Sequence, residues 1–391
     1  MRPSRYLSAV LGVCVAGCTT IVPLDHAVVA YDEATAKSVE QQLLLNIARA
    51  RNNQPIHFTA VSSIAATYRM TTNAGIGPAL TGNRGGLVVP IIGTATESSP
   101  TISIAPMQGD EFTQRLLTPF REAQLTLLLR QGYDVDSLFR LLGGEIHLDR
   151  PGGGDTIHHN RPSDREGYQV FRRIVAHLSA IQDRHALYVE PLHFLHEWTV
   201  PETAVTPETY AATYKDFTIA HDEAAHVYHV LRRINGRVMI TNYDPDILSN
   251  EERLELHRKA DEAPYNDVLI DIRAGHPGGE FPIQGRLRLR SFHEVLTFIG
   301  RGVSEEPEFD VTPDPRTPAI AENPVSTLEI LESRDAPPGG VVSVRVNGMY
   351  YAVKPQSGYQ WNQKTFSLLY QLFQMSVSSS APAGPSITIA K

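Results

Sequence analysis

Both cysteines of this 391-residue chain, Cys14 and Cys18, lie close to its N-terminus. No disulfide and no thiolate metal site can therefore form in the chain that follows them, and its fold must be stable through its hydrophobic core alone. Hydrophobic residues make up 42% of the sequence, which is enough for a sizeable core at this length. We expect two domains or one elaborated domain.

Residues 1–17 have the pattern of a signal peptide. Arg2 and Arg5 precede an uncharged run that is too short to cross a bilayer as a stable helix. An ordinary signal peptide, or an N-terminal membrane anchor that happens to contain a cysteine, would show the same charges and apolar run.

The end of this run favours a third possibility, because Val15-Ala16-Gly17-Cys18 resembles the bacterial lipobox. The resemblance implies that the mature protein begins at Cys18 and that its thiol carries acyl chains. Each buried methylene of such chains contributes roughly 0.8 kcal/mol, so the protein would stay anchored to the bilayer. Thr19, in place of the Asp of many inner-membrane lipoproteins, implies the outer membrane, with the body in the periplasm.

The charge of the chain argues against nucleic acid as a partner. The formal net charge of −8 becomes about −10 when Arg2 and Arg5 are removed. A duplex-binding site needs a basic field that this composition does not supply.

The N-terminal half changes its hydrophobic period near residue 63. An amphipathic pattern over residues 32–52 predicts a helix, and from Ser63 apolar and polar residues alternate as in a long strand. After a glycine-rich turn region a second extended run covers residues 87–105, so we predict a long hairpin over 63–105. The apolar positions of its first arm are Ile64, Ala66, Tyr68, Met70, Ala74 and Ile76.

Periodicity and turn signals predict the remaining elements. The expected helices cover 111–130, 135–142, 167–183, 251–260, 291–299 and 362–375. The expected strands cover 187–199, 225–234, 237–243, 268–272 and 286–290, with a hairpin over 341–353. Asn235-Gly236 and Asn347-Gly348 are predicted hairpin turns, because both central residues of such a turn need positive φ and Asn and Gly adopt it readily.

These patterns predict an α+β fold, with amphipathic helices packed on antiparallel hairpins and a long β-hairpin in the N-terminal half. The loop that begins at Arg150 is the expected domain boundary. We expect a signal peptide (1–17), a lipidated tether (18–31), a helix–hairpin–helix region (32–150), an α+β domain (151–303), an acidic proline-rich linker or loop (304–324), a hairpin plus helix that packs on the α+β domain (325–375), and a disordered tail (376–391).

Several blocks of the chain resemble a group of proteobacterial envelope proteins. They are Gln41–Arg51, Pro100–Gly109, Arg290–Gly300, Tyr350-Tyr351 and Lys364–Leu369. The blocks carry no catalytic motif that can be transferred, so the resemblance implies the class and the location of the protein only.

Histidines suggest a metal site, but their spacing does not support one. His221, His226 and His229 form the densest cluster, and its spacing of five differs from the spacing of four in the zinc-protease helix. The pairs His158-His159 and His193 with His196 specify no coordination sphere either. We therefore expect no metal and no cofactor.

Motifs of other enzyme classes are incomplete in this chain. Asn242, Asp244, Asp246 and Asn250 lack the glycine and the glutamate of a calcium loop. There is no Gly-x-Ser-x-Gly elbow, and the glycines at 152–154 lack the Lys-Ser/Thr of a phosphate-binding loop. We expect a protein that is not an enzyme, and a metal-dependent hydrolase is the least supported alternative.

Two further functions follow from these expectations. The first is an outer-membrane lipoprotein that acts as a binding or structural component of an envelope assembly, with an envelope protein or further copies of itself as partner. The second is an oligomeric lipoprotein whose 63–105 hairpins form an outer-membrane β-barrel channel, since each arm is about as long as a membrane strand, which needs roughly 9 to 11 residues. In that case Arg69 and Glu97 would face the lumen. A hairpin packed on the protein's own core would show the same alternation and is the other interpretation of this segment.

Overall fold

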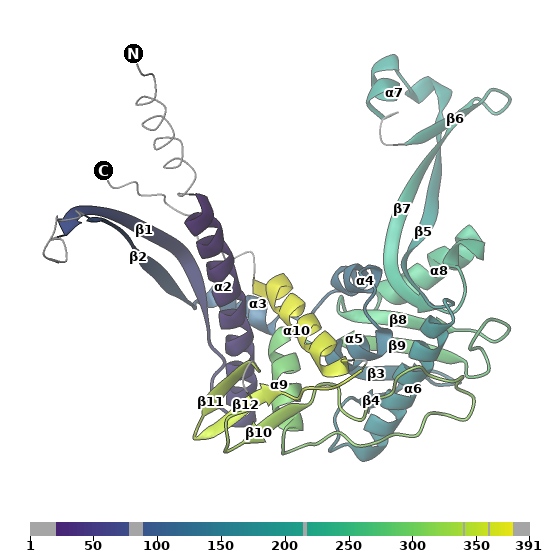
Figure 1. Ribbon diagram of the computed structural model, residues 1–391. Helices are drawn as coiled ribbons and strands as arrows, with labels where there is room; N and C mark the ends of the chain where they lie inside the picture. Colours follow the sequence, from purple (N-terminus) through teal and green to yellow (C-terminus); the bar gives the residue numbers. More distant parts are fainter. Residues whose placement is uncertain (1–20, 78–88, 214–216, 339–340, 359, 378–391) are drawn as a thin grey trace, which may run out of the picture. The chain divides into compact units, whose positions relative to one another are not determined.

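The computed structural model describes residues 21–77, 89–213, 217–338, 341–358 and 360–377 (Figure 1). Within residues 21–27 and 61–103 only the backbone is described. Contacts divide the chain into two units. Unit 1 comprises residues 1–42, 57–112 and 378–391, and unit 2 comprises residues 43–56 and 113–377. Helices and mostly antiparallel strands alternate along the described residues, which confirms the α+β class.

Unit 1 contains the predicted long hairpin. β1 (Phe58–Gly77) and β2 (Val89–Met107) pair antiparallel from Phe58↔Met107 to Gly77↔Val89, with one irregularity between Val61 and Ser63. The register sets Arg69 opposite Glu97. The apolar set from Ile64 to Ile76 occupies alternate positions of β1, and its entry into a membrane stays a prediction.

The N-terminal helix is longer than the sequence pattern predicts. α2 spans Ile21–Arg51, so the expected tether over 18–31 is helical from Ile21 onward. Cys18 and most of the predicted tail over 376–391 lie outside the described residues. Within unit 1, Gln42 of α2 accepts hydrogen bonds from the amide and the hydroxyl of Thr59, which join α2 to the base of β1.

The described part of unit 2 is built on a seven-stranded sheet with the order β4-β3-β9-β8-β7-β5, and β6 also pairs with β7. β7 and β8 run parallel because the helix α8 crosses between them, and the other pairs are antiparallel. The strands are β3 (Gly143–Asp149), β4 (Asp155–His159), β5 (Tyr188–Pro201), β6 (Thr218–Asp222), β7 (Val227–Thr241), β8 (Asp267–Ile272) and β9 (Ile283–Leu289).

Eight helices besides α2 are described. They are α3 (Asp110–Leu117), α4 (Glu122–Arg130), α5 (Val135–Leu142), α6 (Arg165–Asp183), α7 (Pro207–Thr213), α8 (Asn250–Asp261), α9 (Phe292–Gly302) and α10 (Trp361–Val377). Two 3₁₀ turns are η1 (Glu202–Ala204) and η2 (Pro245–Ile247). α6 packs against α5 and β4, and its inward face is buried with Phe171, Ile174 and Leu178.

A small sheet of unit 2 confirms one predicted hairpin. β10 (Ile330–Ser333), β12 (Met349–Val353) and β11 (Ser343–Val346) pair in this order. Asn347 and Gly348 form the turn with φ of 49° and 84°, the left-handed values that this dipeptide adopts readily.

The predicted turn at Asn235-Gly236 is wrong. β7 continues through this dipeptide, because the strand pairs with β5 on both sides of it, and the turn lies instead between β6 and β7, where His226 has a φ of 52°. Gly236 serves close packing: a Cβ there would lie 3.0 Å from the His257 ring and 3.0 Å from the Phe194 ring.

The predicted helix over 111–130 is also wrong, because it is two helices. α3 ends at Leu117, two residues before Pro119, which has no N–H and restricts its predecessor to extended geometry. Pro119 forms a β-bridge with Ser291, and the Phe120 amide donates to the Arg290 carbonyl at 2.9 Å.

Two segments expected at domain borders lie inside unit 2. The loop after Arg150 joins β3 and β4, which pair with each other in one sheet. The acidic segment 304–324 has no helix or strand, yet it contributes the buried side chains of Glu308 and Val311. Neither segment therefore separates two compact units of the chain.

Gly300 is expected to be intolerant of a side chain. A Cβ there would lie 2.8 Å from the Arg51 amide nitrogen and 2.9 Å from the Ile47 carbonyl oxygen, and backbone atoms cannot move aside cheaply. Gly300→Ala should lower the free energy of unfolding by about 1–3 kcal/mol in urea denaturation. Gly302→Ala is the matched control, since a Cβ at this end of α9 meets nothing within 4 Å. Equal stability of the two variants would contradict this packing.

Candidate functional site

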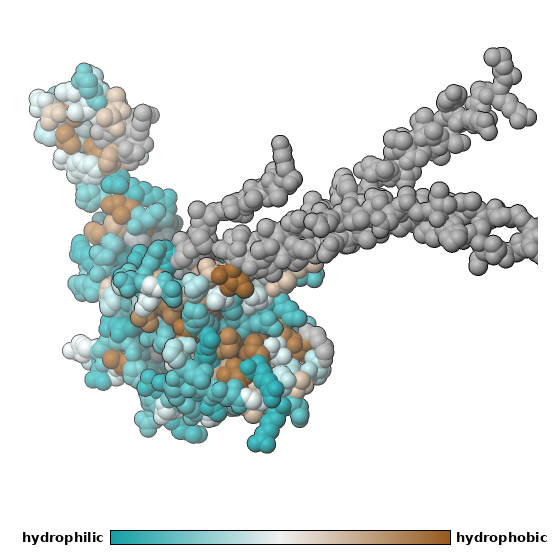
Figure 2. Space-filling model, turned by 90° about the vertical axis from the view of Figure 1, so that its left-hand side faces the viewer, coloured by the Kyte–Doolittle hydropathy of each residue, from teal (hydrophilic) through white to brown (hydrophobic). Residues whose placement is uncertain are grey.

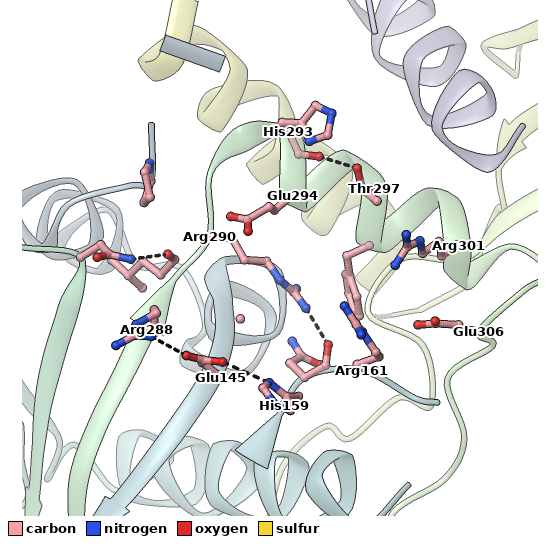
Figure 3. A pocket seen from close by; sticks show the side chains of 16 residues that line it. Glu145, His159, Arg161, Arg288, Arg290, His293, Glu294, Thr297, Arg301 and Glu306 are labelled. Atoms are coloured by element: carbon pink, nitrogen blue, oxygen red, sulfur yellow. Dashed lines mark hydrogen bonds and ion pairs between the residues drawn. The ribbon is translucent and has the colours of Figure 1, made fainter. Parts of the chain in front are cut away.

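A cavity of about 460 Å³ opens in unit 2 where β3, β9 and α9 meet (Figure 3). Its wall combines charged side chains with a few apolar ones. The charged and histidine side chains are Glu145, His159, Arg161, Arg288, Arg290, His293, Glu294, Arg301 and Glu306. Segments far apart in the sequence thus contribute to one concave surface, as is typical of ligand sites.

Arg290 lies under this pocket, directly between β9 and α9. Its Nη1 donates to the carbonyls of Arg140 and Leu141, each at 3.2 Å, and its Nη2 donates to the Asn160 carbonyl at 2.7 Å. The guanidinium also stacks 4.0 Å from the centre of the Phe298 ring. Burial lowers the pKa of Arg290 to about 10, although the carboxylates of Glu294 and Glu308 oppose the shift at longer range.

At one end of the pocket the charged side chains are paired with one another. Arg288 donates to Glu145 at 2.7 Å and to Asp267 at 2.7 Å, and His159 lies 3.0 Å from the second Glu145 oxygen. Burial opposes ionisation of Glu145, but the hydrogen bond with His147 and the charge of Arg288 hold its pKa below the usual value. Glu145 is therefore already occupied as an acceptor.

Glu294 is occupied in a different way, at the start of α9. Its carboxylate accepts from the Ser291 amide at 2.7 Å, and the Ser291 hydroxyl accepts from the Glu294 amide at 3.2 Å. This reciprocal capping box satisfies two amides of the first helical turn.

The opposite end of the pocket has a different charge balance. Figure 3 shows Arg161 and Arg301 grouped there with Glu306. Among the described residues neither guanidinium has a hydrogen-bond or ion-pair partner. This end of the pocket therefore offers two uncommitted cations.

A buried ion cluster supports the residues beneath the pocket. The Glu308 carboxylate lies 3.5 Å from Arg140 and 3.8 Å from Arg172, and it accepts from the Tyr168 hydroxyl at 2.8 Å. Burial opposes ionisation of Glu308, but both guanidinium groups hold its pKa below the ordinary value. The backbone carbonyl of Arg140 accepts hydrogen bonds from Arg290 and from the Asn160 side-chain amide.

The histidines considered as metal ligands lie elsewhere. His221, His226 and His229 belong to the β6–β7 hairpin, where His226 contacts Glu202 at 3.1 Å and His229 contacts Glu197 at 2.7 Å. His221 lies in β6, His226 in the turn and His229 in β7, so the three do not share one helical face. Across the described ranges no group of three or more His, Cys, Asp or Glu side chains is placed to hold a metal ion.

The other paired histidines are also held by neighbours. His193 bonds to Asn235 at 2.9 Å, and His196 packs 5.3 Å from Trp198. Of the His158-His159 pair, only His159 reaches the pocket. The residues whose spacing falls short of a calcium loop form a turn and a cap: Asp244 caps η2 by accepting from the Asp246 amide, and Asn250 bonds to the backbone of Leu195.

No pattern in the sequence indicates the arginine-lined pocket. The lining residues come from positions more than 180 apart, between Pro119 and Glu306. The one local signal was Ser291-x-x-Glu294, which marks the start of α9 but not the cavity beside it.

A second cavity, of about 350 Å³, lies at the far end of the long β5–β7 arm. Figure 2 shows apolar residues at this end among hydrophilic ones. They include Trp198, Phe217, Tyr228 and Val230. This cavity differs in chemistry from the arginine-lined pocket, because its wall is mainly apolar.

No protein-family model matches the chain, and no match was found among curated proteins or solved structures. In the described residues, no helix has both the length and the apolar character needed to span a membrane.

Glu308 is expected to be a main determinant of stability. Glu308→Gln leaves Arg140 and Arg172 buried without their shared carboxylate, so the free energy of unfolding at pH 7 should fall by about 3–5 kcal/mol. Because the folded-state pKa is lowered, this contribution is complete above the unfolded pKa of roughly 4.3 and is lost as the pH falls through the folded pKa. The difference between wild type and variant should shrink accordingly in acid urea titrations.

Glu255→Gln is the control for this experiment. Its carboxylate is 72% exposed and pairs only with Arg258 on the same helix. Exposed pairs contribute little, so this variant should unfold like the wild type. A Glu308→Gln protein as stable as the control would show that the buried cluster is not stabilising.

Proposed function

We propose that this chain is an exported lipoprotein, held on the outer membrane by acyl chains on Cys18, whose body is a non-catalytic binding or structural component of an envelope assembly. We infer the lipid anchor from the sequence Val15-Ala16-Gly17-Cys18, which ends a short apolar run after two arginines.

The pocket supports a binding role. General acid–base catalysis needs carboxyl or imidazole groups that can exchange protons with a substrate. Here Glu145 is held by Arg288 and His159, and Glu294 caps α9, while Arg161 and Arg301 offer permanent positive charge. Two of the three pocket carboxylates are thus engaged, and the arginines beside the third, Glu306, favour recognition of a charged ligand.

The β5–β7 arm supports a place in an assembly. β5 and β7 pair from Tyr188↔Thr241 to Pro201↔Val227, and the arm extends beyond the other strands of its sheet (Figure 1). Its end carries the apolar cavity between η1, α7 and the β6–β7 hairpin. A projecting element with apolar side chains at its end is suited to contact with another protein.

Substitution of Cys18 should release the protein from membranes. Cys18→Ser removes the thiol that accepts the lipid, so the variant should move to the soluble fraction and its mass should lack acyl chains. Cys14→Ser is the matched control, since Cys14 belongs to the predicted signal peptide and should leave acylation intact. Unchanged fractionation of Cys18→Ser, or an unmodified native N-terminus, would refute the proposal.

One observation favours the oligomeric channel as a second candidate. β1 and β2 have 20 and 19 residues and pair along their whole length, which exceeds the roughly 9 to 11 residues of a membrane-crossing strand. Size-exclusion chromatography of detergent-extracted protein should then give a discrete, heat-resistant oligomer. A monomer would eliminate this candidate and leave the anchored binding protein standing.

A further inference from the structure

We propose that the arginine-lined pocket binds the phosphate group of a phosphomonoester at its Arg161–Arg301 end. This inference rests on the proposed binding function and names the chemical class of its ligand.

The two guanidinium groups of this end give it a net positive charge even with Glu306 beside them. Arg161 follows β4 and Arg301 lies in the last turn of α9, so two separate backbone elements present one guanidinium each. A phosphate has three terminal oxygens and can accept from both groups at once, and arginine forks match that geometry well. A carboxylate can also bridge two guanidinium groups, as Glu308 does for Arg140 and Arg172, but a phosphate adds a third oxygen and a second negative charge.

The rest of the pocket does not compete for this anion. Arg288 is paired with Glu145 and Asp267, and Arg290 is committed to three backbone carbonyls. Arg290 still contributes positive potential from beneath, because no carboxylate among the described residues lies within ion-pair distance of it. The anion would therefore bind above a fixed buried charge.

The size of the cavity leaves room for an organic group on the phosphate. Inorganic phosphate would fill only a small part of 460 Å³, which lies within the usual range for small-molecule sites. Pro119, Leu289 and Phe298 add apolar surface to the wall. They would contact the body of the ligand while Arg161 and Arg301 hold its head.

Glu306 provides an internal test of the charge argument. Its carboxylate lies at the same end of the pocket as Arg161 and Arg301 in Figure 3. It repels an incoming anion, so neutralising it should strengthen binding, whereas neutralising either arginine should weaken it.

The phosphate can come from a soluble metabolite or from a lipid headgroup. Full-length acylated protein in detergent micelles should be titrated by calorimetry with glycerol 3-phosphate and with a short-chain phosphatidic acid. Acetate and glycerol serve as probes without phosphate. Binding of both phosphate compounds, or of one alone, supports the proposal and identifies the source. Failure of both, or equal binding of acetate, overturns it.

Variants locate the binding to this pocket. Arg161→Gln and Arg301→Gln should each weaken binding at least about ten-fold, and Glu306→Gln should strengthen it. Arg258→Gln is the matched control, because Arg258 is 63% exposed on α8 and pairs with Glu255. Thermal unfolding confirms that each variant folds. Phosphate binding that is unaffected in both pocket variants overturns the assignment.

The two proposals fail independently in these experiments. A pocket that binds no phosphomonoester, in a protein whose Cys18 is acylated, refutes the ligand class and leaves the anchored binding function. A Cys18 without lipid refutes the anchor, whatever the calorimetry gives.

Discussion

The charge pairing around Glu308 is buried and connects three separate segments of unit 2. A carboxylate and two guanidinium groups are expensive to remove from water, and they are tolerated only because each is paired and hydrogen-bonded. Thr327 and Tyr168 complete the acceptor capacity of Glu308, while the carbonyls of Pro324 and Val325 take donors of Arg140 and Arg172. The cluster thereby joins a loop without secondary structure to α5 and α6.

This cluster also explains how the pocket acquires a fixed floor. Arg140 sits at the end of α5 with its side chain in the cluster and its carbonyl directed to Arg290. Asn160 bridges the same carbonyl and that of Gly143, so the start of β3 and the end of β4 are tied together below the cavity. Arg161 directly follows the tethered Asn160 and Arg301 lies within α9, so both arginines start from ordered backbone, as a binding site needs for a defined geometry.

Local signals predicted those elements whose formation depends on neighbouring residues. The helix after Ser249 forms because Ser249 and Glu252 satisfy each other's amides, and the turn at Asn347-Gly348 forms because these residues tolerate positive φ. The same reasoning failed at Asn235-Gly236, where pairing with β5 over many residues outweighs the preference of two residues for a turn. It failed at Pro119 as well, because the apolar period continued across a residue that cannot continue a helix.

Short-range patterns are sufficient to predict the α+β class, the long hairpin of unit 1 and a lipid anchor, since each depends on the order of residues within a short segment. The packed chain alone reveals which charges pair in the core, that the acidic 304–324 segment packs inside unit 2, and that arginines from distant positions meet at one pocket. This difference arises because hydrophobic period, caps and turns act over a few residues. Ion pairing and cavity formation instead depend on distances in space that the chain sets only when its helices and strands pack.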